Sequence, residues 1–440
     1  MIEKILREAK KKADGAEVFY GESEERSIRF KSNQLHSINV KETSGVGLRV
    51  IHKGRVGFSS SMDLTNHLNR VVEKAIESSE FGQKAKFSFP SSVGAGFTPA
   101  HSVKVYSEEV RDFPQARGIE MGREVIEEIH TKNPEIQTDF IIEKEISRSQ
   151  LLNSSGLDLS TESTFFSFVI EGFLIVDGSF LWISEGKGSC RLLDETKPFV
   201  KSLLWKADLA KKVAPIKTKR MPVLFTPWTI PTLLQAFALG VNGKTIVKGS
   251  SPLLNRRGEK ILDERVTLSD DGTLDYGLGS APFDGEGIPT RRTGLFEKGV
   301  LKSYLFDLQT AGVMGEETTG NGERGFGSLP SPGRTNFILE PGGKTMNELM
   351  KDMEDGIIVY DVIGGGQSNL LAGDFSLNVG LGFKIERGEI TGRVKDVMVS
   401  GNVYEAFNRI REIGCEVEEI FTVHSPPIQF DNLNVTSRES

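Results

Sequence analysis

The spacing of apolar residues predicts a short helix followed by strands at the start of the chain. Residues 1–13 place Ile2, Ile5, Leu6, Ala9 and Ala13 on one face of an amphipathic helix. The next segments have the alternation typical of strands: Ala16–Tyr20, Arg26–Ser32, Leu35–Val40 and Gly47–Phe58. Lys53-Gly54 divides the last of these, which predicts a hairpin.

Two further helices are predicted on either side of a linker. Helical spacing marks residues 64–76 and residues 107–130, and the segment Phe89–Pro99 between them is rich in Pro, Ser and Gly. Strands resume at Phe140–Ser149 and run through Thr164–Trp182.

The first half of the chain contains a hint of internal duplication. Residues 27–35 can be laid over residues 149–157, an offset of 122, with the same strand-turn-strand pattern. Two unrelated hairpins with similar turns explain the match equally well. We therefore expect an N-terminal α+β domain at residues 1–213, with sub-blocks 1–100 and 101–213.

The lysine-rich segment Lys206–Lys219 marks the boundary to a β-rich domain at residues 214–440. Hairpins are predicted at Gly294–Phe306 and Phe383–Val394, and short helices at residues 346–354 and 403–413. Strands and helices thus occur in blocks without strict alternation, which indicates the α+β class.

The longest uncharged stretch, Met221–Gly243, has the length of a membrane span, but three prolines and several polar residues interrupt it. A buried strand followed by a short helix is the better interpretation, and no membrane association is expected. The N-terminus spaces its apolar residues helically among charges, so no signal peptide is expected.

Composition narrows the classes of function. The chain has 440 residues and a net charge of −7, which disfavours direct binding to nucleic acid. Its two cysteines, Cys190 and Cys415, are too few for a disulfide framework or a cysteine-rich zinc site. A reduced, cytoplasmic setting fits this composition.

Sequence motifs for common chemistries are incomplete. Gly320–Gly325 satisfies G-x-G-x-x-G, but the following Phe-Gly-Ser-Leu-Pro cannot open the helix that a dinucleotide requires. No two of the six histidines lie within six residues of each other, and none is followed by glutamate. A helix that binds a hydrolytic zinc is therefore not visible.

Three consecutive glycines, Gly364, Gly365 and Gly366, follow an apolar strand. Without Cβ atoms they allow close approach of another backbone or of a ligand. Two interpretations remain open: a tight crossing inside the fold, or a cleft wall that binds an extended peptide as an added strand.

The run from Gly364 to Asn402 resembles the TldD/PmbA family, also called modulators of DNA gyrase. The resemblance rests mainly on Gly373-Asp374-Phe375-Ser376, Gly382-Phe383, Gly388-Glu389-Ile390 and Val399-Ser400-Gly401-Asn402. Supporting segments lie in order along nearly the whole chain: residues 44–50, 282–287, 299–301 and 319–322.

The resemblance implies a cytosolic metallopeptidase that acts on small or unfolded peptides as a pair of related subunits. In the TldD-type subunit, a helix with HExxxH and a downstream cysteine hold the metal. The corresponding segments here are Thr229–Leu239, which contains no His, Glu, Asp or Cys, and Thr422–Ser425, where His424 is the only potential ligand. The chain therefore resembles the PmbA/TldE type, whose implied partner is a TldD-type subunit carrying zinc or iron.

No catalytic residue, metal ligand or cofactor is expected in this chain on that basis. Candidate residues of a substrate cleft are Gly364, Gly365, Gly366, Asp374, Asp284, Asn321 and His424. One alternative is an autonomous metallopeptidase whose ligands are dispersed among His424, Asp284, Glu286 and Asp374. Another is a non-enzymatic regulator that binds gyrase or toxin proteins. A surface that pairs with a related subunit can also pair with itself, so a homodimer is allowed.

Overall fold

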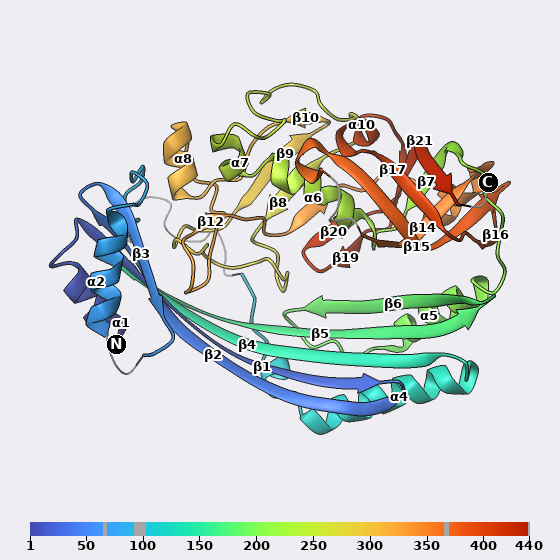
Figure 1. Ribbon diagram of the computed structural model, residues 1–440, viewed down its shortest axis with the longest axis horizontal. Helices are drawn as coiled ribbons and strands as arrows, with labels where there is room; N and C mark the ends of the chain where they lie inside the picture. The colour runs from blue at the N-terminus through green and yellow to red at the C-terminus, as the bar shows by residue number, and fades with distance from the viewer. Residues whose placement is uncertain (65–67, 92–102, 365–368, 439–440) are drawn as a thin grey trace.

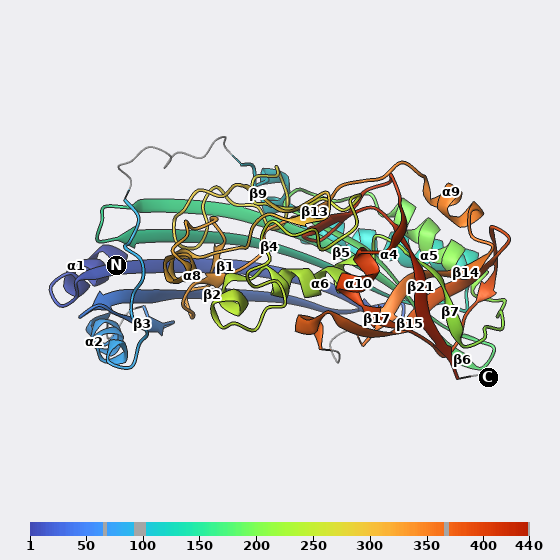
Figure 2. The same ribbon diagram turned by 90° about the horizontal axis from the view of Figure 1, so that it is seen from above.

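A long, curved antiparallel sheet forms the N-terminal part of the computed structural model, which describes residues 1–64, 68–91, 103–364 and 369–438 (Figure 1). Its strand order is β3-β2-β1-β4-β5-β6. The strands run along the long axis of the molecule (Figure 2). They are β1 (Gly15–Lys31), β2 (Gln34–His52), β3 (Arg55–Ser61), β4 (Gln137–Asn153), β5 (Asp158–Val176) and β6 (Ser179–Ser189).

Helices cover one face of this sheet at its two ends. The helices α1 (Ile2–Ala9) and α2 (Leu68–Ser79) pack at one end on Val18 and Leu48, which face each other on β1 and β2. The longer helices α4 (Gln115–Lys132) and α5 (Lys197–Leu209) cover an aromatic cluster at the other end. The opposite, concave face of the sheet is turned toward the C-terminal domain (Figure 1).

The predicted strands 16–20 and 26–32 are one continuous strand, β1, and the predicted break within β2 is also wrong. In the described part of the chain, no helix covers the middle of the sheet, and the sequence between the apolar segments is polar there. Backbone pairing with neighbouring strands maintains the strand there, as in the pairs Glu22↔Ser44 and Glu22↔Arg148. Side-chain periodicity therefore did not reveal the full length of this strand, which pairing with the neighbouring strands maintains.

Two predicted helices also differ from the structure. The helix expected at residues 107–130 is divided into α3 (Glu108–Arg111) and α4 by Pro114, which is extended and cannot donate a backbone hydrogen bond. The segment 403–413 is half helix, α10 (Val403–Phe407), and half strand, β18 (Ile410–Ile413). The Lys53-Gly54 hairpin is confirmed, with both residues at positive φ.

The order helix, three strands, helix occurs twice in the N-terminal part. The strands β1 and β4 each have 17 residues, and β2 and β5 each have 19. The strands β1 and β4 pair antiparallel at the centre of the sheet, so the two halves meet at this pair. This is the arrangement expected of a duplicated unit, and the duplication itself remains a prediction.

The C-terminal part contains two main sheets around one core. One has the order β14-β7-β21-β17-β15-β16 with β18 paired to β21, and the other has the order β10-β9-β8-β13-β20-β19. Their strands are β7 (Lys219–Phe225), β8 (Leu268–Asp271), β9 (Arg292–Glu297), β10 (Val300–Leu301), β13 (Phe337–Leu339), β14 (Asp355–Ile363), β15 (Asp374–Glu386), β16 (Glu389–Arg393), β17 (Val397–Asn402), β19 (Glu418–Ile420), β20 (Val423–Ser425) and β21 (Ile428–Ser437). A small pair, β11 (Gly322–Glu323) and β12 (Ser331–Pro332), completes the strands.

Short helices complete the C-terminal part: α6 (Ile230–Gly240), α7 (Gly243–Val247), α8 (Leu308–Met314) and α9 (Met346–Lys351). The strand β7 followed by α6 confirms the interpretation of Met221–Gly243, and both predicted hairpins are present. The segregated strands and helices confirm the α+β class. Over the described ranges, the structure has no helix with the length and apolar character needed to cross a membrane.

Candidate functional site

Four buried charged side chains join the N-terminal sheet to two loops of the C-terminal domain. Arg49 donates from Nε to Glu17 Oε1 at 3.1 Å and from Nη1 to Glu286 Oε1 at 2.5 Å. Arg324 donates from Nη1 to the same oxygen of Glu17 at 2.5 Å. None of these side chains is more than 2% exposed. Three of the segments that support the family resemblance, around residues 49, 286 and 322, thus lie together at this junction.

The register of the sheet and its glycines create this junction. Glu17 and Arg49 are directly opposite each other on β1 and β2, and both point toward the C-terminal domain. The ring of Phe326 occupies the space where a Cβ atom of Gly45 would lie. Glycine at this position therefore lets the loop 324–326 rest on the sheet and brings Arg324 to Glu17.

Asp284 holds the two loops together through backbone amides. Its Oδ1 accepts from the amides of Glu286 and Ile288, each at 2.9 Å, and its Oδ2 accepts from Gly322 at 2.8 Å. Glu286 in turn accepts from the amide of Leu308, at the start of α8, through Oε2 at 2.7 Å. All four oxygens of the two carboxylates near this turn therefore have partners.

Burial raises the pKa of three carboxyl groups at the junction. Burial and the neighbouring Glu286 raise the pKa of Asp284 to about 7. Burial also raises the pKa of Glu17, opposed by Arg49 and Arg324, and it raises the pKa of Asp307. Asp284 therefore retains its proton to a higher pH than an exposed aspartic acid does.

A cavity of about 240 Å³ lies beside this junction and is lined by Asp284, Asn321 and Arg324. Asn321 Nδ2 donates to Asp270 Oδ2 at 2.6 Å, and burial raises the pKa of Asp270 to about 6. Much of the remaining lining is glycine backbone: Gly279, Gly285, Gly320, Gly322 and Gly333. The arrangement suits binding of a polar chain against backbone groups.

A second cavity, of about 370 Å³, lies between the concave face of the sheet and the loop 324–326. Its floor is formed by alternate residues of β1, β2, β4 and β5, most of which carry hydroxyl groups: Ser23, Thr43, Ser147, Ser149, Thr161 and Ser163. Small hydroxyl side chains can hydrogen-bond to a peptide backbone without selecting particular side chains.

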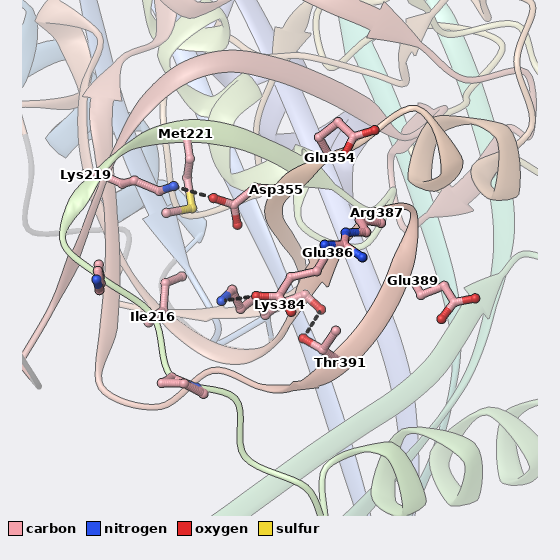
Figure 3. Close-up of a pocket in the computed structure, with 12 residues that line it drawn as sticks. Ile216, Lys219, Met221, Glu354, Asp355, Lys384, Glu386, Arg387, Glu389 and Thr391 are labelled. Atoms are coloured by element: carbon pink, nitrogen blue, oxygen red, sulfur yellow. Dashed lines mark hydrogen bonds and ion pairs between the residues drawn. The ribbon is translucent and has the colours of Figure 1, made fainter.

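A larger cavity, of about 950 Å³, lies away from these loops, at residues 215–221 and the β15–β16 hairpin (Figure 3). Its charged side chains are of both signs, and several are already paired. Lys219 pairs with Asp355, and Lys384 pairs with Glu386 (Figure 3). None of the cleft candidates that fall within the described residues lines this cavity.

The structure brings together two of the predicted cleft residues, Asp284 and Asn321, at one cavity, and Gly364, Asp374 and His424 do not line it. Gly364, at positive φ, directly follows β14, and Asp374 begins β15, where its Oδ1 accepts from Asn402 Nδ2 at 3.0 Å. His424 lies on β20 in the other sheet. Gly365 and Gly366 lie outside the described residues, so the interpretation of the triple glycine remains a prediction.

The residues proposed as dispersed metal ligands do not form one site. Burial lowers the pKa of His424, and its Nε2 atom has no hydrogen-bond partner in the part of the chain that the structure describes. Asp284 and Glu286 are engaged by backbone amides and by Arg49. Among the described residues, no group of three His, Cys, Asp or Glu side chains is arranged to hold a metal ion.

Sequence reasoning missed Glu17, Arg49 and Arg324. A signal for two of them exists, because Glu17 and Arg49 each interrupt a strongly apolar strand segment. A charge at such a position requires a partner when it is buried. The partners could not be identified from the neighbouring sequence, since Arg49 and Glu286 are 237 residues apart.

Comparisons with known proteins agree with this convergence of motifs. A family model described as the PmbA/TldA metallopeptidase C-terminal domain matches residues 218–437, and one described as domain 1 of that group matches residues 16–79. A similar relative is an uncharacterised protein of Methanocaldococcus jannaschii, 29% identical over 436 residues and covering 98% of both chains. A metalloprotease of Methanothermobacter thermautotrophicus is 28% identical over 423 residues, covering 94% of this chain and 90% of that one.

The fold is also that of a solved structure. TldE from Thermococcus kodakarensis superimposes with a TM-score of 0.90 at 24% identity, covering 99% of both chains. The matched family models and the convergent loops lead to the same conclusion. The chain belongs to the PmbA/TldD metallopeptidase family.

Proposed function

We propose that this chain is the PmbA/TldE-type subunit of a two-component cytoplasmic metallopeptidase, and that a TldD-type partner supplies the metal. Its substrates are small or unfolded peptides. The observation that carries the proposal is the composition of α6, the helix that follows β7 at the place where the family resemblance implies HExxxH.

The side chains of α6 do not fit a catalytic metal. Zinc or iron in a hydrolase requires imidazole, thiolate or carboxylate ligands. The polar side chains of α6 are only the Thr232 hydroxyl and the Gln235 amide, while Leu233, Leu234 and Phe237 are buried in the core. The helix therefore serves packing, and no hydrolytic step is assigned to it.

The role left to this chain is to bind and orient the peptide. The two polar cavities on either side of the loop 324–326 offer glycine backbone and hydroxyl groups to an extended chain. The buried charges of Glu17, Arg49 and Arg324 keep the loop and the sheet in one arrangement. A peptide held there would reach a metal only with the partner in place.

Co-expression with a family member that carries HExxxH tests the proposal. We expect the two chains to purify together and to cleave unfolded peptides in a chelator-sensitive reaction. Neither activity nor tight zinc is expected for this chain alone. A matched preparation in which the partner's HExxxH glutamate is replaced by glutamine should bind this chain without cleaving peptide. Chelator-sensitive cleavage by the isolated chain would contradict the proposal.

A further inference from the structure

The cavity of about 240 Å³ beside the buried junction contains an arginine whose guanidinium group is unpaired. Arg334, just after β12, lines this cavity, and over the described residues its guanidinium makes no hydrogen bond or ion pair. Its Nη1 atom is buried, and the guanidinium carbon lies 5.5 Å from the ring centre of Phe337. A buried donor without an acceptor is costly, so this side chain is ready to receive one.

Two carboxylates act on Arg334 through their charge, but neither accepts a hydrogen bond from it. Burial lowers the pKa of Arg334, and the charges of Asp270 and Glu323 oppose that effect. Both oxygens of Asp270 are occupied: Oδ2 accepts from Asn321 Nδ2 at 2.6 Å and from Thr335 Oγ1 at 2.8 Å, and Oδ1 accepts from the Thr335 amide at 2.7 Å. The guanidinium therefore keeps its hydrogen-bonding capacity for another acceptor.

Backbone amides of the cavity wall already donate within the loops. Those of Gly285, Gly322 and Gly333 have their acceptors in neighbouring segments. Arg324 also lines the cavity, and its Nε and Nη2 atoms have no partner in the described part of the chain, but this side chain is fully buried. Arg334 is only half-buried, so it is the charged donor that a ligand in the cavity can reach.

The acidic groups of the same wall narrow the class of anion. Asp284 and Glu323 both line the cavity, so they repel a phosphate dianion more strongly than a singly charged carboxylate. The planar guanidinium fits a carboxylate through two parallel hydrogen bonds. The cavity is smaller than the about 300 Å³ at which pockets begin to enclose a whole ligand, so it suits one end or one side chain of a longer molecule.

We propose that this cavity binds a carboxylate of the peptide substrate and that Arg334 donates to it. The carboxylate belongs either to the C-terminus of the peptide or to an aspartate or glutamate side chain. That the ligand is a peptide rests on the function proposed above, whereas the preference for a carboxylate rests on the cavity alone. Arg334 is then a residue that selects among peptides, and it takes no part in hydrolysis.

Binding of short peptides to the isolated full chain tests the proposal without a partner or cleavage. Three six-residue probes of alanine, glycine and serine differ in charge: a free C-terminal acid, its C-terminal amide, and the amide with one serine replaced by glutamate. We expect isothermal titration to show a carboxylate-bearing probe binding about ten- to hundredfold more tightly than the plain amide. Tight binding of the acid identifies the C-terminus as the source, and tight binding of the glutamate probe identifies the side chain.

Substitution of Arg334 links this preference to the cavity. Arg334→Gln should abolish the preference, and Arg334→Lys should retain only part of it, because lysine keeps the charge but loses the paired geometry. The matched control is Arg123→Gln, which removes the same charge from an exposed position of α4 and should keep the full preference. Circular dichroism checks that the three variants keep the wild-type fold.

Three results would overturn the inference: equal binding of all three probes, no binding of any probe up to about 1 mM, or a preference that Arg334→Gln leaves unchanged. Failure of the proposed function would instead appear as no co-purification or cleavage with a partner that carries HExxxH. That failure would leave the preference for a carboxylate, and its loss in Arg334→Gln, intact, so the two failures can be told apart.

Discussion

Replacing Arg49 with methionine removes the cation that two buried carboxylates share. Methionine retains the packing against Phe87 and Phe89, whose ring centres lie 4.6 and 5.2 Å from the guanidinium carbon. Glu17 keeps Arg324, but Glu286 keeps only the Leu308 amide. Removing one partner of a buried ion pair costs about 3–5 kcal/mol, so we expect the free energy of unfolding to fall by that amount.

Urea denaturation followed by tryptophan fluorescence and circular dichroism measures this loss. The matched control is Arg292→Met, which breaks the surface pair of Arg292 with Glu340, both about half exposed, and should cost only about 0–1 kcal/mol. Adding Glu286→Gln to Arg49→Met should restore part of the stability, because it removes the unpaired charge. Equal effects of Arg49→Met and Arg292→Met would refute the account of the junction.

Two further predictions concern the same junction. The folded-state pKa of Asp284 is raised from 3.8 to about 7, so the folded chain binds more protons than the unfolded chain between these values. The contribution of Asp284 to the free energy of unfolding should therefore fall as the pH rises from about 4 to 7, so thermal melts should show the stability of Asp284→Asn relative to the wild type rising over this range. A Cβ atom on Gly322 would lie 2.7 Å from Glu286 Oε2, so Gly322→Ala should cost about 1–3 kcal/mol by urea denaturation, whereas Gly327→Ala, with open space around it, should be nearly neutral. An unchanged pH profile in the first case, or equal costs in the second, would contradict the site geometry.

Local turn chemistry and apolar periodicity were enough to predict much of the fold. The hairpins at Lys53-Gly54 and Arg387-Gly388 follow from residues that accept positive φ, and α1 follows from a regular apolar face. The continuity of β1 through Glu22–Glu25 could not be predicted, because those residues have no apolar alternation and are held by cross-strand hydrogen bonds. Pro114 was a local signal that the helical periodicity around it obscured.

Only part of the candidate site could be predicted from the sequence, because some of its contacts join residues that are far apart along the chain. Asp284 and Asn321 lie in glycine-rich loops that the family resemblance identified. Glu17 and Arg324 are 307 residues apart in the sequence, and their contact depends on how the two domains pack. Chain-local patterns do not carry that information, whereas a buried charge within an apolar strand at least indicates that a distant partner exists.

The metal content of the purified chain tests the central claim most directly. After dialysis against zinc or iron(II) and removal of excess metal, the account predicts far less than one ion per chain and no change in content when α6 residues are substituted. One tightly held ion per chain, removed by a chelator and lost on substitution in α6 or at His424, would contradict the assignment of this chain as the subunit without the metal.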